Sequence, residues 1–153
     1  MQDLIRINSH FAVAALPLDR TDIQQAAQNG FGSIVNLRTT AEKQELAPDA
    51  EGRIAKNQGL AYLHHPVSGD DLSEDAVERF RQKINSLPGP ILVHCATGRR
   101  SGALVMMHLA IEQGLSGEQA VEKAAYLGFE CDTPELEAFV KHYVNGHTSA
   151  AAA

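Results

Sequence analysis

The segment that decides the fold is residues 91–102, which read Ile-Leu-Val-His-Cys-Ala-Thr-Gly-Arg-Arg-Ser-Gly. An apolar run ends in His94 and Cys95, a short loop with a glycine follows, and a helix-compatible segment begins at Ser101. This order predicts a buried strand, a loop and a helix. The start of the helix would direct free backbone N–H groups and a positive dipole toward Cys95. Because a thiolate is the nucleophilic form of cysteine and needs positive surroundings, Cys95 is a candidate nucleophile.

The loop after Cys95 also carries groups that hold an oxyanion. Arg99 and Arg100 follow within the loop, and an arginine binds a phosphate-like anion through two parallel hydrogen bonds. Successive backbone N–H groups of residues 96–99 can form an anion nest around the same point. The residue types and their order therefore predict a thiolate placed to attack a bound oxyanion.

This segment resembles the signature of the cysteine-dependent phosphatases, the protein tyrosine and dual-specificity phosphatase superfamily. In that signature His-Cys is followed by five residues, an Arg, and a Ser or Thr. The residues that match it are His94, Cys95, Gly98 and Ser101. Four residues rather than five separate Cys95 from Arg100, and Arg99 would shorten the gap further, so Arg100 is favoured. A loop of this length is also similar to that of rhodaneses, whose cysteine carries sulfur.

Other segments resemble a bacterial dual-specificity-phosphatase-like family that occurs alone or fused to metallo-β-lactamase-like hydrolases. These segments are residues 30–38, Glu42 and residues 62–67. Members of that family can carry the shortened loop of Cys, four residues and Arg. The resemblance covers residues 3–145. It implies a single-domain α/β fold, the cysteine-phosphatase-like sandwich, with a mostly parallel central sheet flanked by helices.

The resemblance also implies roles for single residues. Cys95 would attack phosphorus, Arg100 and the loop N–H groups would hold the phosphoryl oxygens, and a loop aspartate would protonate the leaving group. Asp70 and Asp71 both follow a Pro-Val step and qualify as that acid, with Asp70 favoured. Ser101 would hydrogen-bond the sulfur in the second step. The expected substrate-binding residues are His94, Ala96, Thr97, Gly98, Arg99, Arg38 and Asp71.

Two other functions fit the same residues. A rhodanese-like sulfurtransferase or persulfide-handling enzyme would carry a sulfane sulfur on Cys95; the short loop favours it, whereas the aspartates and Ser101 count against it. A non-catalytic anion-binding module would keep the fold with misplaced oxyanion donors. Arg38 also has two interpretations of equal weight. It lies near the active site at a strand end, or it is a solvated loop residue paired with Glu42.

Composition limits the class of protein and of partner. The chain has 153 residues, 44% of them hydrophobic, which suits one folded domain. A formal net charge of −6 argues against nucleic acid as a partner, because phosphate backbones favour basic surfaces. We expect a phosphorylated protein or a small-molecule phosphoester as partner, with no membrane contact, no metal and no other cofactor. A cytoplasmic location is expected, with Cys95 a free thiol and Cys131 a buried one.

Hydrophobic patterns and turn residues predict the elements in chain order. A hairpin of residues 4–7 and 11–14 would close one edge of the sheet. Strands are expected over residues 31–37, 60–65 and 91–95, and helices over 21–30, 49–58, 73–87, 101–113, 116–127 and 133–145. Thr21 and Gln24 would form the capping box of the first helix. Gly146 would end a phosphatase-like domain of residues 1–146, which leaves residues 147–153 as a frayed tail.

Overall fold

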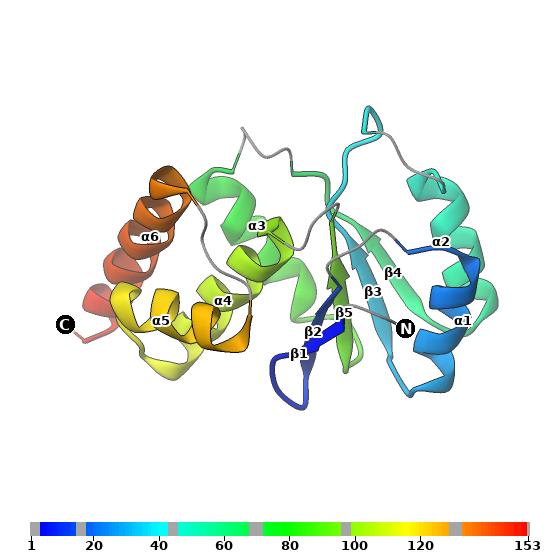
Figure 1. Cartoon of the computed structure of the whole chain (residues 1–153), viewed down its shortest axis with the longest axis horizontal. Coiled ribbons are helices and arrows are strands. Elements are labelled where there is room, and N and C mark those ends of the chain that lie inside the picture. The colour runs from blue at the N-terminus through cyan, green and yellow to red at the C-terminus, as the bar shows by residue number, and fades with distance from the viewer. Residues whose placement is uncertain are drawn as a thin grey trace. The chain divides into compact units, whose positions relative to one another are not determined.

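The computed structural model describes residues 4–14, 18–42, 46–67, 72–95, 99–128 and 133–152, the last five of them by their backbone alone. The chain forms two compact units, residues 1–101 and residues 102–153 (Figure 1). The first unit contains the sheet and the first three helices, and the second contains most of the fourth helix and the last two. Within the described ranges, no helix has both the length and the apolar character needed to cross a membrane.

The first unit is built on a five-stranded sheet in the order β1-β2-β5-β3-β4. The strands are β1 (Leu4–Arg6), β2 (Phe11–Ala14), β3 (Ser33–Asn36), β4 (Ala61–His64) and β5 (Ile91–His94). β1 and β2 are antiparallel, whereas β2, β5, β3 and β4 are parallel neighbours in that order. The predicted mostly parallel sheet is therefore confirmed, and so is the hairpin that closes one of its edges.

Three helices pack on this sheet, namely α1 (Arg20–Gln28), α2 (Pro48–Asn57) and α3 (Glu74–Ile84). Buried apolar side chains of α1 and α2 form one cluster with Ile34 of β3 and Leu92 of β5. α1 and α2 therefore cover one face of the sheet, and α3 lies on the other side (Figure 1). The apolar stripe of α3 is buried as its helical spacing predicts, with Val77 and Phe80 both fully enclosed.

The start of α1 differs from the predicted one. Asp19, not Thr21, is the N-cap; its Oδ1 accepts from the Asp22 N–H at 2.8 Å, and Asp22 Oδ2 accepts from the Asp19 N–H at 3.1 Å. The predicted capping box of Thr21 and Gln24 is therefore wrong, because the aspartate pair satisfies the free N–H groups two residues earlier.

The predicted cap of α3 is confirmed, since the Ser73 hydroxyl accepts from the Ala76 N–H.

Helix α4 (Arg99–Gln113) begins in the first unit and continues into the second, which also holds α5 (Gly117–Leu127) and α6 (Pro134–Ala152). Residues 101–110 are all buried, as the apolar composition of this helix predicts. α6 continues through Gly146, so the predicted helix end there is wrong. The Asn145 side chain instead accepts from the Gly117 N–H at 2.8 Å, where a Cβ on Gly117 would lie 2.5 Å from Lys141 Cα. α5 and α6 therefore approach closely at Gly117.

Candidate active site

Cys95 directly follows β5, a strand with parallel neighbours on both sides. Its side chain is buried and forms no disulfide. Helix α4 begins at Arg99, so the predicted strand before the loop and helix after it are confirmed. In open α/β sheets the ligand crevice lies at the carboxyl ends of the strands. The candidate nucleophile therefore occupies the position in the sheet where such folds bind ligands.

Arg100 is held by the loops that follow β3 and β4. Its Nη1 and Nη2 atoms donate to the two carboxylate oxygens of Glu42 at 2.8 and 2.7 Å. Nη1 also donates to the carbonyl oxygen of Val67 at 2.7 Å. The Thr39 N–H in turn donates to Glu42 Oε2 at 2.6 Å, which fixes the carboxylate. The guanidinium orientation is thus set by two segments distant in sequence.

These contacts determine the charge state of the pair. The hydrogen bonds from Arg100 lower the pKa of Glu42 to about 2. The same bonds raise the pKa of Arg100, and the neighbouring Cys95 acts in the same direction. An arginine has five N–H donors, of which Glu42 and Val67 take three. Of the other two, one is directed to the Cys95 sulfur.

A buried polar cluster, formed by Asn36, Arg38, Glu51, Tyr62 and His94, lies behind Cys95. Glu51 Oε2 accepts from His94 Nε2 at 2.7 Å, and Glu51 Oε1 accepts from Arg38 Nη2 at 3.2 Å, with all three side chains at most 1% exposed. Asn36 Oδ1 accepts from the Arg38 N–H, and Asn36 Nδ2 donates to the Tyr62 hydroxyl at 3.1 Å. Because a carboxylate only accepts, Nε2 of His94 carries a proton. Glu51 thereby orients the residue that precedes the nucleophile.

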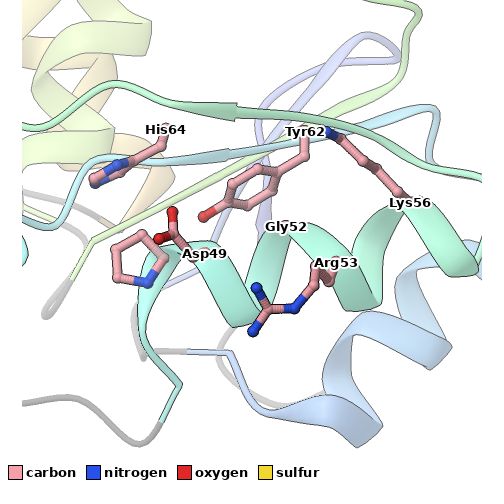
Figure 2. Close-up of a pocket in the computed structure, with 7 residues that line it drawn as sticks. Asp49, Gly52, Arg53, Lys56, Tyr62 and His64 are labelled. Carbon is pink, nitrogen blue, oxygen red and sulfur yellow. The ribbon is translucent and has the colours of Figure 1, made fainter.

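The Tyr62 side chain, from β4, takes part in this cluster and also packs against α2. Burial and the charge of Glu51 raise the pKa of Tyr62, which keeps its hydroxyl protonated. The ring packs against α2 at Gly52, where a Cβ would come within 2.9 Å of the ring (Figure 2). A glycine at the centre of a helix is unfavourable by itself. Here it provides the space that Tyr62 occupies.

The structure brings five predicted site residues to one end of the sheet. They are His94, Cys95, Arg99, Arg100 and Ser101, which lie in or beside the loop that joins β5 to α4. The Ser101 hydroxyl is buried and has no hydrogen-bond partner among the residues that the structure describes. The predicted residues Asp70, Asp71, Ala96, Thr97 and Gly98 lie outside the described ranges, as does Cys131.

Arg38 lies just beyond the end of β3, near the Cys95 loop, as one of its two interpretations expects. It is not a solvated loop residue paired with Glu42, because its guanidinium is 1% exposed and is paired with Glu51. Glu42 pairs with Arg100 instead. In this geometry Arg38 contributes charge to the buried polar cluster, and no exposed part of it faces a substrate.

Glu51 is the functional residue that sequence reasoning missed. A signal for it exists: Glu51 shares one face of α2 with Ile54 and Ala55, at a spacing of three and four residues. A carboxylate on an otherwise apolar buried face needs a cationic partner, and two candidates lie at the ends of neighbouring strands: Arg38 follows β3, and His94 ends β5. Among the described residues, no group of three or more His, Cys, Asp or Glu side chains is arranged to hold a metal ion.

The chain is similar to known proteins in sequence and in fold. The sequence matches the family described as "Beta-lactamase hydrolase-like protein, phosphatase-like domain" over residues 3–115. A beta-lactamase hydrolase-like protein of Xylella fastidiosa is 30% identical over 126 residues, which are 82% of this chain and 28% of that protein. The chain thus spans just over a quarter of the length of that curated relative.

Two solved structures confirm the predicted fold class. TpbA from P. aeruginosa, in a complex with pTyr, has a TM-score of 0.75 at 20% identity and covers 98% of this chain and 90% of its own. The core catalytic domain of the PP-IP phosphatase SIW14 from S. cerevisiae, in complex with citrate, has a TM-score of 0.71 at 16% identity. That match covers 99% of this chain and 91% of the SIW14 chain. The family match extends from β1 to α4 and includes the Cys95 loop and the buried polar cluster. The chain therefore belongs to the family of phosphatase-like domains of beta-lactamase hydrolase-like proteins.

Proposed function

We propose that this chain is a cysteine-dependent phosphomonoester hydrolase that works through a cysteinyl-phosphate intermediate. The observation that carries the proposal is the pairing of the buried Cys95 sulfur with Arg100, whose guanidinium Glu42 and Val67 hold in place. A positive neighbour favours the thiolate, and the N–H donor of Arg100 that Glu42, Val67 and Cys95 do not use favours a bound oxyanion.

In the first step the Cys95 thiolate forms a bond to phosphorus while the ester P–O bond breaks. The departing oxygen takes its proton from Asp70, and Arg100 neutralises charge on the equatorial oxygens. In the second step water attacks phosphorus, the S–P bond breaks, and the proton from water passes to the Asp70 carboxylate. Inorganic phosphate leaves and the thiolate is restored. A hydrogen bond from Ser101 to the sulfur would help it depart.

The reach of the chain supports Asp70 as the acid. The Val67 carbonyl lies 2.7 Å from Arg100 Nη1, and Asp70 follows Val67 by three residues. Three residues span at most roughly 10 Å, so the backbone of residue 70 is tied to within about that distance of Val67. The buried Ser101 hydroxyl, which lacks a partner among the described residues, supports its role toward the sulfur.

The relatives support the same class of substrate. The family carries a phosphatase-like name, and TpbA is recorded in complex with pTyr as a variant with Ser in place of Cys. We infer a phosphorylated protein or a small-molecule phosphoester as substrate, and a cytoplasmic setting in which the thiol stays reduced. No metal or other cofactor enters the reaction.

The test is hydrolysis of 4-nitrophenyl phosphate across pH by the wild-type protein and by Cys95→Ser, Asp70→Asn and Asp71→Asn. We expect no turnover by the serine variant, and loss of the rate decrease at basic pH in Asp70→Asn but not in the matched Asp71→Asn. Undiminished hydrolysis by Cys95→Ser rules the mechanism out. A persulfide on Cys95 after incubation with thiosulfate, with no ester hydrolysis, would assign sulfur transfer instead.

A further inference from the structure

A pocket of about 360 Å³ lies between α2 and β4, and the reaction proposed above does not use it (Figure 2). The first turns of α2 form one side, and the side chains of Tyr62 and His64 form the other. β4 is the last strand of the sheet, so the pocket opens at the edge of the first unit. Small-molecule sites in proteins have volumes of roughly 300–1,000 Å³, and this one is in that range.

The pocket lining has an excess of positive charge. Arg53 and Lys56 line it, and in the part of the chain that the structure describes neither is ion-paired with an acidic side chain. Asp49 is the one carboxylate among the lining residues. The chain as a whole is negatively charged, with a formal net charge of −6. Two exposed cations beside a hollow in an acidic protein indicate a site for an anion.

The walls of the pocket are fixed before any ligand binds. The Tyr62 ring packs at Gly52, and its hydroxyl accepts from Asn36 Nδ2. His64 Nε2 lies 2.6 Å from the carbonyl oxygen of Arg38, to which it donates, so the orientation of the His64 ring is fixed as well. A site whose walls are already ordered loses little side-chain entropy on binding.

The pocket extends along β4, and its end at His64 lies at the same end of the sheet as Cys95. Asn36 pairs in register with His64 on one side and with His94 on the other. Adjacent strands are about 4.8 Å apart, so His64 lies on the order of 10 Å from the residue that precedes Cys95. Arg53 and Lys56 belong to the later turns of α2, so a second anionic group that reaches them lies on the order of 10 Å or more from the reacting one.

We propose that this pocket is a subsite for a second anionic group, a phosphate or a carboxylate, of the substrate whose reacting phosphate is held at Cys95. Arg53 and Lys56 supply the charge and the hydrogen-bond donors. The inference rests on the proposed phosphatase function. It goes further because it selects substrates with two separated anionic groups over those with one.

The first experiment measures equilibrium binding by calorimetry to the full chain carrying Cys95→Ser. The probes are fructose 1,6-bisphosphate and fructose 6-phosphate. We expect the bisphosphate to bind about tenfold more tightly, and the double variant Arg53→Gln/Lys56→Gln to lose that preference. The matched control Arg79→Gln/Lys83→Gln removes the same charge from the exposed face of α3 and should keep the preference. Two outcomes overturn the subsite. One is equal affinity for the two sugar phosphates together with equal affinity for the two peptides described below. The other is a preference for the bisphosphate that persists in Arg53→Gln/Lys56→Gln.

A second arm identifies the source of the second anion. A phosphotyrosine peptide with flanking glutamates is compared with one that has flanking alanines, in the same variants. A glutamate preference lost in Arg53→Gln/Lys56→Gln assigns peptide carboxylates, and a preference seen only with the bisphosphate assigns a small molecule. Absence of both overturns the proposal. Because Cys95→Ser binds without turnover, wild-type protein that hydrolyses no ester would refute the proposed reaction while leaving these binding results intact.

Discussion

Glu42 and Arg100 form a two-point ion pair, with N–O distances of 2.7 and 2.8 Å, although 58 residues separate them in sequence. Glu42 binds the edge of the guanidinium that carries Nη1 and Nη2. Arg100 also donates a hydrogen bond to the Cys95 sulfur. The orientation of Arg100 is therefore set within the protein itself, by a residue of the loop that follows β3.

The first prediction concerns this orientation. Glu42→Gln keeps the size of the side chain but removes its charge and one of its two acceptor oxygens. Since misplacement by about 1 Å can cost roughly a hundredfold in rate, kcat/KM for an aryl phosphate should fall by about ten- to a hundredfold. The matched control is Glu122→Gln, an exposed acid on α5, which should leave kcat/KM unchanged. Unchanged kcat/KM in Glu42→Gln would show that Arg100 needs no such support.

The second prediction concerns acid stability. The pKa of Glu42 is about 2 in the folded protein and about 4.5 as its ordinary value. Between these values the unfolded chain binds more protons, so the pair's contribution is complete above pH 4.5 and is lost as pH falls through 2. Urea unfolding from pH 6 to pH 2 should show the stability difference between wild type and Glu42→Gln shrinking across that window. A difference that does not change with pH would contradict the pKa.

The third prediction concerns the buried polar cluster. Glu51→Gln leaves the Arg38 guanidinium buried without a counter-charge, which costs about 3–5 kcal/mol in the free energy of unfolding. Replacing both residues, as Glu51→Gln/Arg38→Met, removes the isolated charge and should recover part of that loss. Denaturant unfolding of the two single variants and the double variant measures the coupling. Strictly additive effects would show that the pair acts as two independent residues.

The fourth prediction concerns Gly52. Alanine is favoured over glycine in a helix by roughly 1 kcal/mol, so Gly52→Ala would stabilise an isolated α2. In the protein the new Cβ would lie 2.9 Å from the Tyr62 ring, so we expect the free energy of unfolding to fall instead. In a Tyr62→Ala background the contact is gone and the sign should reverse. Stabilisation by Gly52→Ala with Tyr62 intact would contradict this packing.

The elements that the sequence predicted well are those with a strong local pattern. The apolar runs of β2, β3 and β5 and the stripe of Val77 and Phe80 in α3 lie where their periodicity places them. Element ends were harder to predict, because neighbouring polar residues compete for the same role. Asp19 caps α1 in place of Thr21, and Asn145 binds the Gly117 N–H instead of ending α6.

The residues of the candidate site differ in the same way in how well the sequence predicted them. His94, Cys95, Arg100 and Ser101 were recognisable because they are contiguous or nearly so. Glu51 was not, since its partners Arg38 and His94 lie 13 and 43 residues away and meet it only after the strands pair. The partner of Glu42 was misassigned for the same reason: sequence distance favoured Arg38, whereas the loops that follow the strands bring Arg100 to it.

The polar residues at the ends of the parallel strands also bear on how the sheet assembles. Asn36, His64 and His94 occupy one level across β4, β3 and β5 and point to the same face. A slip of β3 by one residue would turn Asn36 to the opposite face and break its hydrogen bond to Tyr62. It would also leave the Arg38 guanidinium among apolar side chains without its partner Glu51. The polar residues beside Cys95 therefore also disfavour a pairing of the central strands that is shifted by one residue.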